Sequence, residues 1–161
     1  MRPSTFVGSN HFVMPTIEIP KTKEIEKVIH SPFVVHQTSE HLTIHRITSN
    51  DRFTQIDFIH YADPIYHKGG WVQIDRDTFI RPNGSNHKLT LVDAFGIPYA
   101  PEKHHYNSTT AFLCYTLYFP ALPKSTTSID IIEKETTGGN WFNFYGVAIE
   151  KALSQRLVAN N

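Results

Sequence analysis

The stretch from Thr110 to Ile149 constrains the fold more than any other part of the sequence. It predicts three consecutive β-strands separated by turns. In the first of them an apolar side chain occupies every second position, a period that is typical of a half-buried strand. These residues are Ala111, Leu113, Tyr115, Leu117 and Phe119. Pro120 and Pro123 then end the strand, because proline lacks the N–H that a β-ladder needs. The stretch therefore predicts an antiparallel β-domain.

Similar patterns recur along the chain at the intervals expected for β-sandwiches and barrels. The predicted strands are Lys27–Gln37, Leu42–Thr48, Phe53–Tyr61, Gly70–Asp75, His87–Val92, Thr110–Phe119, Ser128–Glu133 and Trp141–Ile149. Asn83-Gly84 can supply the positive φ angles of a tight hairpin. We expect Gly146 to form a bulge that moves Val147 and Ile149 to the core side of the last strand.

The 161 residues are enough for one domain with a substantial core. Residues 1–24 contain three prolines among small polar groups, so we expect an extended N-terminal arm. Residues 25–149 form the β-sandwich domain. In residues 150–161, Leu153 and Leu157 continue a four-residue spacing from Ile149, which predicts a short amphipathic helix. The predicted fold class is thus all-β, an antiparallel sandwich of seven to eight strands.

The charge pattern excludes several classes of partner. The net charge is zero, with 15 basic and 15 acidic side chains, and no Lys/Arg cluster exists to follow a phosphate backbone. We therefore expect no nucleic-acid partner. No apolar run approaches the roughly eighteen residues of a membrane helix, so we expect no membrane insertion. The first residues lack the continuous apolar segment of a secretory signal. Cys114 is the only cysteine, which rules out an internal disulfide.

Metal ligation is the first chemistry to consider, because histidines gather in two loops. His60, Asp63 and His67 bracket a proline turn that two glycines follow, and His104-His105 lies in a second loop. Neither set has the three or four regularly spaced ligands of known zinc motifs. We therefore expect ordinary loop histidines and neither a metal nor another cofactor. A metal-dependent hydrolase that uses these histidines is the less favoured alternative.

Motifs of other enzymes are missing as well. The sequence has no Gly-x-Ser-x-Gly, no His-Glu-x-x-His, and neither the phosphate-binding nor the dinucleotide-binding glycine pattern. Its carboxylates are dispersed along the chain, which is typical of solvated strand and turn residues. The sequence predicts no catalytic residue and favours a binding protein over an enzyme.

Aromatic side chains suggest where binding could occur. Trp71 and Trp141 each follow a pair of glycines at the start of a predicted strand. Exposed tryptophans at the end of a sandwich can stack on sugars or anchor a partner, whereas buried ones close the rim of the core. The candidate ligand-binding residues are Trp71, Trp141, Tyr99, His104 and His105. The exposure of the two tryptophans distinguishes these alternatives.

Five segments in a fixed order resemble a known family. They are WVQIDRDTFI from Trp71, KLTLVDAFGIP from Lys88, LYFPALP from Leu117, IDIIE from Ile129 and WFNFYGV from Trp141. Together they resemble the immunoglobulin-like β-sandwich accessory domains of bacterial envelope proteins, some of which are fused to thioredoxin-like domains. The resemblance implies an immunoglobulin-like sandwich, an extracytoplasmic location and no catalytic residues.

The working hypothesis from the sequence is a non-catalytic binding or accessory module with an unknown protein or glycan partner. A carbohydrate-binding module, which would expose Trp71 or Trp141, is the alternative, although tryptophans at such positions more often close the rim of the core. The sequence predicts no particular oligomeric state.

Overall fold

The computed structural model describes residues 26–150, and their regular structure consists of twelve β-strands. The arm predicted for residues 1–24 lies outside the described residues, as does the helix predicted for residues 150–161 apart from Glu150. Within the described part of the chain no helix has the length and apolar character needed to cross a membrane. The fold is all-β, as the sequence predicts.

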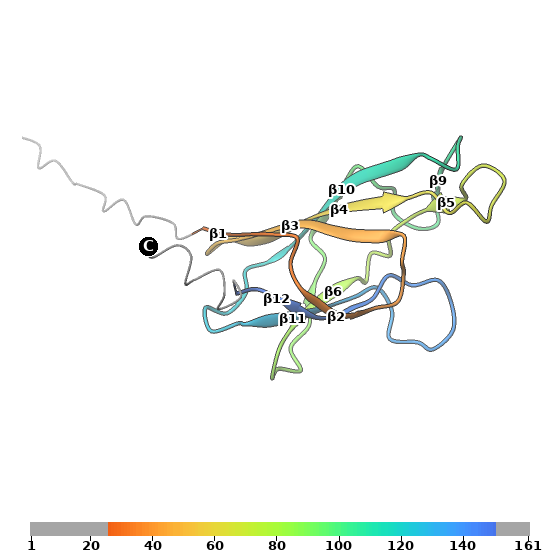
Figure 1. Cartoon of the computed structure of the whole chain (residues 1–161). Helices are drawn as coiled ribbons and strands as arrows, with labels where there is room; N and C mark the ends of the chain where they lie inside the picture. Colours follow the sequence, from red (N-terminus) through yellow and green to blue (C-terminus); the bar gives the residue numbers. More distant parts are fainter. Residues whose placement is uncertain (1–25, 151–161) are drawn as a thin grey trace, which may run out of the picture.

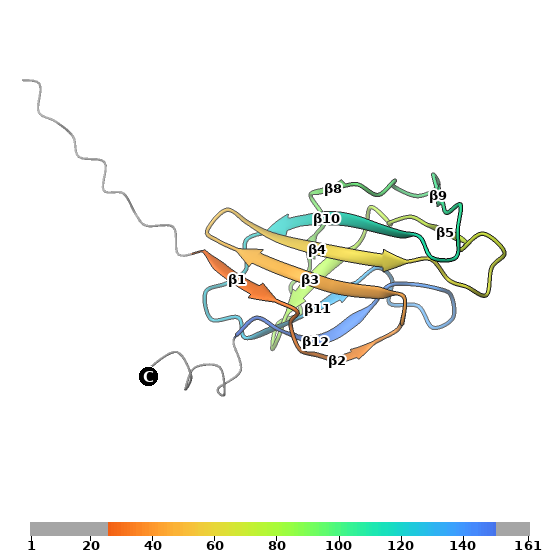
Figure 2. The same cartoon turned by 45° about the horizontal axis from the view of Figure 1, so that its top comes forward.

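Two five-stranded sheets form two layers that face each other in a sandwich-like arrangement (Figures 1 and 2). The first sheet contains, in spatial order, β1 (Lys27–His30), β3 (Leu42–Ser49), β4 (Phe53–Tyr61), β10 (Phe112–Pro120) and β8 (Asp93–Phe95). The second sheet contains β2 (Val34–Gln37), β12 (Phe144–Ala148), β11 (Ser128–Ile132), β6 (Phe79–Pro82) and β7 (Leu89–Thr90). A small ribbon pairs β5 (Trp71–Val72) with β9 (His104–His105). All of these pairings are antiparallel.

A single hydrophobic cluster fills the space between the two larger sheets. The ring of Phe58 on β4 stacks on Tyr115 of β10, and its centroid lies 5.9 Å from that of Phe144 on β12, in the opposite sheet. The alternation predicted for β10 is confirmed, because Tyr115, Leu117 and Phe119 are buried. Ala111 and Leu113, at the start of this face, are only half-buried.

The single strand predicted for Lys27–Gln37 is wrong. The chain turns at Ser31, where φ is 45°, and passes from the first sheet to the second. β1 therefore pairs with β3, whereas β2 pairs with β12. Pro32 follows this turn and lacks the N–H that would continue a ladder.

The region between β4 and β10 also differs from the prediction. Gly70–Asp75 and His87–Val92 contain only the two-residue strands β5 and β7, and β6 was not predicted. β6 lies between β11 and β7 in its sheet, and three of its four residues are buried, so side chains on both faces of this strand are covered. The two-residue alternation that marks a half-buried strand is therefore absent from its sequence.

The predicted bulge at Gly146 is confirmed, whereas the tight hairpin predicted at Asn83-Gly84 is confirmed only in part, because Gly84 alone of the two has a positive φ and residues 83–88 separate β6 from β7. Gly84 has a φ of 71° in a turn closed by the bond from Ser85 N to Pro82 O at 3.2 Å. At Gly146 the register of β12 against β11 shifts, and φ is 65°. A side chain at position 146 would collide with Val35 on the neighbouring strand, so this bulge requires glycine.

The core assignment predicts that Leu117→Ala costs ~2–5 kcal/mol of unfolding free energy, because Leu117 is only 1% exposed between the sheets. Urea denaturation measures this change. Cys114→Ala is the matched control, since Cys114 is exposed on the same strand and its removal should change stability by less than about half a kcal/mol. Equal effects of the two substitutions would contradict the assignment.

Candidate functional site

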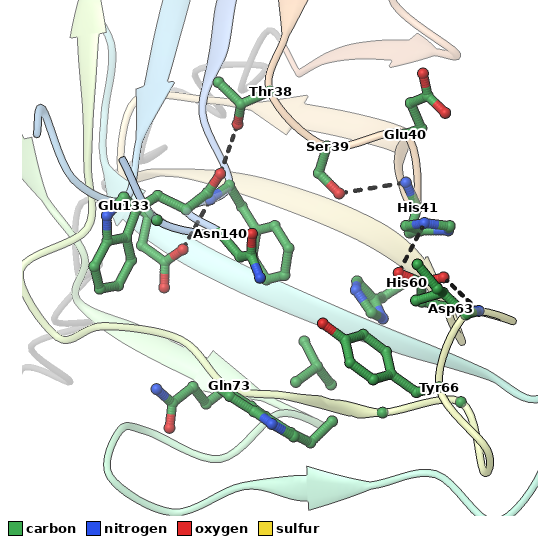
Figure 3. Close-up of a pocket in the computed structure, with 18 residues that line it drawn as sticks. Thr38, Ser39, Glu40, His41, His60, Asp63, Tyr66, Gln73, Glu133 and Asn140 are labelled. Carbon is green, nitrogen blue, oxygen red and sulfur yellow. Dashed lines mark hydrogen bonds and ion pairs between the residues drawn. The ribbon is translucent and has the colours of Figure 1, made fainter. Parts of the chain in front are cut away.

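A pocket of about 690 Å³ opens at one end of the sandwich (Figure 3). Its walls come from the β2–β3 loop (residues 38–41), the end of β4 with the loop that follows, the start of β5, and the segment from Glu133 to Phe142 that joins β11 to β12. Pockets that hold small ligands have about 300–1,000 Å³. The volume of this pocket is therefore suited to a small molecule or to a few units of a polymer.

The buried Glu133 side chain connects two segments of the pocket wall, the loop before β12 and the segment after β5. The residue follows β11, and only 4% of its surface is exposed. Its Oε2 accepts a hydrogen bond from Phe142 N at 2.9 Å, and its Oε1 accepts one from Asp75 N at 3.2 Å. The carboxylate thus ties the loop before β12 to the segment after β5. Burial raises the pKa of Glu133 to about 7, although the two backbone hydrogen bonds act in the opposite direction.

Asn143 and Thr38 fix the base of the loop before β12. The buried Asn143 side chain accepts a hydrogen bond from Glu133 N at 2.9 Å and donates one to Lys134 O at 2.7 Å. The Thr38 hydroxyl donates to Trp141 O at 2.6 Å and accepts from Asn143 N at 3.0 Å. These bonds attach the loop to β11 and to the β2–β3 loop, so the pocket wall has defined anchors on both sides.

His60 lines the pocket from the end of β4. Its Nδ1 lies 2.7 Å from the Tyr106 hydroxyl, and the two rings stack with an interplanar angle of 6°. The Phe142 ring packs against it at 5.3 Å between centroids. Burial lowers the pKa of His60 to about 4 and raises that of Tyr106 to about 12. Both side chains are therefore uncharged at neutral pH.

The charged groups that line the pocket are mostly negative. Glu40, Asp63 and Glu133 are in its lining, and no lysine or arginine is. Asp63 lies beside His41, whose Nε2 is 3.4 Å from Asp63 Oδ2. The ammonium groups of Lys103 and Lys134 lie over the two tryptophan rings of the lining, so the surroundings of the pocket carry charges of both signs.

Both tryptophans line this one pocket, and they are the only two in the chain. Trp71 is 47% exposed, whereas Trp141 is half-buried and its indole Nε1 has no hydrogen-bond partner among the described residues. The ammonium of Lys103 lies 4.0 Å from the Trp71 ring centroid, and that of Lys134 lies 4.3 Å from the Trp141 ring centroid. Each lysine occupies one face of its ring and restricts its motion.

The other predicted binding residues lie outside the pocket lining. His105 and His104 pair with Trp71 and Val72 in the β5–β9 ribbon, so they support the wall from behind. Tyr99 is more distant from the site. Its ring lies under the Arg76 guanidinium at 3.9 Å, and its hydroxyl reaches Asp93.

Of the three candidate metal ligands, two line the pocket and one lies outside it. His60 and Asp63 line the pocket, whereas His67 is exposed and does not. Within residues 26–150, no group of three or more His, Cys, Asp or Glu side chains is placed to hold a metal ion.

The sequence analysis missed Glu133, although a signal for it existed. Ile129 and Ile131 alternate toward the core, and Glu133 is the next residue with the same spacing. A carboxylate in such a position is either buried with partners or ends the strand. Gln73, Tyr66 and Asn140 also line the pocket, and no sequence pattern marks them.

Comparison of this chain with protein-family models, with curated proteins and with solved structures gives no match. The functional assignment therefore depends on the geometry of the pocket.

The opposite pKa shifts of Glu133 and His60 predict opposite effects of pH on stability. The raised pKa of Glu133 stabilises the fold fully below pH 4.5, and this contribution is lost as pH rises through about 7. The lowered pKa of His60 gives a contribution that is complete above pH 6.5 and is lost as pH falls toward about 4. Between pH 4.5 and 6.5 the two contributions change in opposite directions.

In Glu133→Gln only the His60 contribution remains. The stability of this variant relative to the wild type should therefore increase with pH between 4.5 and 7, by at most about 1.4 kcal/mol per pH unit. Urea titrations at several pH values measure this difference. Glu135→Gln is the control, because Glu135 has a lowered pKa and its difference should stay constant over this range. A constant difference for Glu133→Gln would contradict the assigned shift.

Proposed function

We propose that this protein is a non-catalytic binding module and that the pocket at the end of the sandwich is its ligand site. One observation carries the proposal: both tryptophans line a single pocket together with polar side chains from separate loops. Such a combination of apolar surface and a few convergent polar groups is typical of ligand sites. The anchoring by Glu133 and Asn143 supports a pocket that is formed before the ligand arrives.

The roles of the buried ionisable groups favour binding over catalysis. Both oxygens of Glu133 accept backbone hydrogen bonds, and His60 Nδ1 is held by Tyr106. A general acid or base must reach the proton that it transfers. Glu133 instead holds the loops that form the pocket, which supports the non-catalytic alternative over a hydrolase.

We further propose that the sandwich is immunoglobulin-like and that the module is an accessory domain of an envelope protein. This proposal follows the sequence resemblance, and the two antiparallel sheets are compatible with it. The passage of the chain from the first sheet to the second at Ser31 places β1 and β2 at edges of different sheets, so the first segment contributes to both layers. The partner in that setting would be a glycan or another protein.

A thermal-shift screen against oligosaccharides, amino acids, nucleotides and short peptides tests the ligand site. We expect at least one compound to raise the melting temperature of the wild type, since ligand binding stabilises the folded state. Asn140→Phe should abolish this shift, because Asn140 lies in the pocket and is exposed enough to accept a larger side chain.

Phe112→Ala is the control for the screen, because it removes an exposed aromatic ring outside the pocket and should retain the shift. A shift that survives Asn140→Phe would contradict the proposal, as would a screen in which no compound raises the melting temperature.

A further inference from the structure

Several polar groups in the pocket lack partners within the protein. Gln73 Oε1 and Trp141 Nε1 are buried atoms that form no hydrogen bond among the described residues. The side chains of Tyr66 and Asn140 also form none within residues 26–150. Buried polar groups are nearly always satisfied in folded proteins, by protein, water or ligand. Gln73 Oε1 and Trp141 Nε1 are closed to solvent, whereas the Gln73 amide nitrogen, the Tyr66 hydroxyl and the Asn140 amide are open to it and offer hydrogen bonds that a ligand can complete.

A ligand that both donates and accepts hydrogen bonds matches these groups. The Gln73 amide nitrogen is a donor, and the Tyr66 hydroxyl and the Asn140 amide can each donate and accept. A hydroxyl group can serve any of them. A ligand that carries several hydroxyl groups therefore matches the set better than one with a single polar end.

The charges of the lining restrict the ligand further. Three carboxylates line the pocket, and the ammonium groups of Lys103 and Lys134 lie over its two tryptophan rings, so the charges around the lining are mixed and give an anion no strong preference. The carboxylates do not favour a cation strongly either. Asp63 lies beside His41, and both Glu133 oxygens accept amide hydrogens, which leaves the exposed Glu40. The balance favours a neutral ligand.

The tryptophans add two flat apolar surfaces. Trp71 remains 47% exposed while Lys103 occupies one of its faces, so the ring is held in place with surface left for contact. Trp141 is restricted by Lys134 in the same way. Aromatic rings of this kind pack against the C–H face of a sugar ring, and holding them in place reduces the entropy lost on binding.

We infer that the pocket binds a neutral carbohydrate, with a sugar ring against Trp71 and hydroxyl groups bonded to the Tyr66 hydroxyl, the Gln73 amide nitrogen and the Asn140 amide. The inference rests on the proposed function, in which this pocket is the ligand site. It adds the chemical class of the ligand and assigns specificity to Gln73 and Asn140.

Titration with defined oligosaccharides tests this inference. The neutral probes are the hexasaccharides of maltose, cellulose, xylan, mannan and chitin type. The charged probes are oligogalacturonate and spermidine. Because both tryptophans line the pocket, tryptophan fluorescence reports on binding at this site. We expect at least one neutral probe to change the emission and to bind in calorimetry, with oligogalacturonate at least tenfold weaker.

Variants then locate the binding. Trp71→Ala and Gln73→Leu should each weaken the neutral sugar at least tenfold in calorimetry, whereas Phe112→Ala should leave its affinity unchanged. Phe112 is 61% exposed and lies outside the pocket, so it controls for the loss of an exposed aromatic ring. Circular dichroism checks that each variant is folded.

The outcomes separate this inference from the proposed function. If no neutral sugar binds but spermidine or another compound binds and is blocked by Asn140→Phe, the carbohydrate inference is overturned and the ligand site stands. If a neutral sugar binds with an affinity that neither Trp71→Ala nor Asn140→Phe changes, both are overturned. If oligogalacturonate binds more tightly than every neutral probe, the inference that the ligand is neutral is overturned.

Discussion

The pocket depends on one buried carboxylate that holds two backbone segments together. Glu133 is at the end of β11, and its oxygens accept the amide hydrogens of Phe142 and Asp75. Without these bonds the loop before β12 and the segment after β5 would share no anchor at this point. Asn143 extends the arrangement, because it binds Glu133 N and Lys134 O with the two ends of its amide. The shape of the site thus follows from satisfying polar groups at the end of the sandwich.

The same arrangement explains why the pocket combines an uncharged interior with acidic edges. His60 is buried against Tyr106 and Phe142 and stays neutral, because burial disfavours its charged form. Glu133 is protonated in part near neutral pH for the same reason. Two tryptophans, each under a lysine ammonium, complete the walls. This surface is the basis of the proposal that the pocket binds a neutral, hydroxyl-rich molecule.

The sequence predicted the features that arise from local patterns. Alternation along β10 and the bulge at Gly146 could be predicted because one side chain or one φ angle decides each. The change of sheet at Ser31 could not be predicted from local patterns, because it depends on which sheet each half of the segment Lys27–Gln37 joins. β6 was missed because burial of side chains on both of its faces removes its alternation. Both tryptophans, which were predicted as binding residues, line the pocket, whereas Glu133 was not singled out because the sequence does not show that the backbone amides of Phe142 and Asp75 meet its carboxylate.

Amide hydrogen exchange by NMR tests the central claim, that Glu133 holds the pocket walls together, most directly. Phe142 N and Asp75 N lie outside the regular strands, so their exchange reports on the carboxylate. The account predicts that both amides exchange more slowly than Gly138 N in the exposed loop, and that Glu133→Ala removes this protection while the β4–β10 amides keep theirs. Exchange of Phe142 and Asp75 as fast as that of Gly138 in the wild type would contradict it.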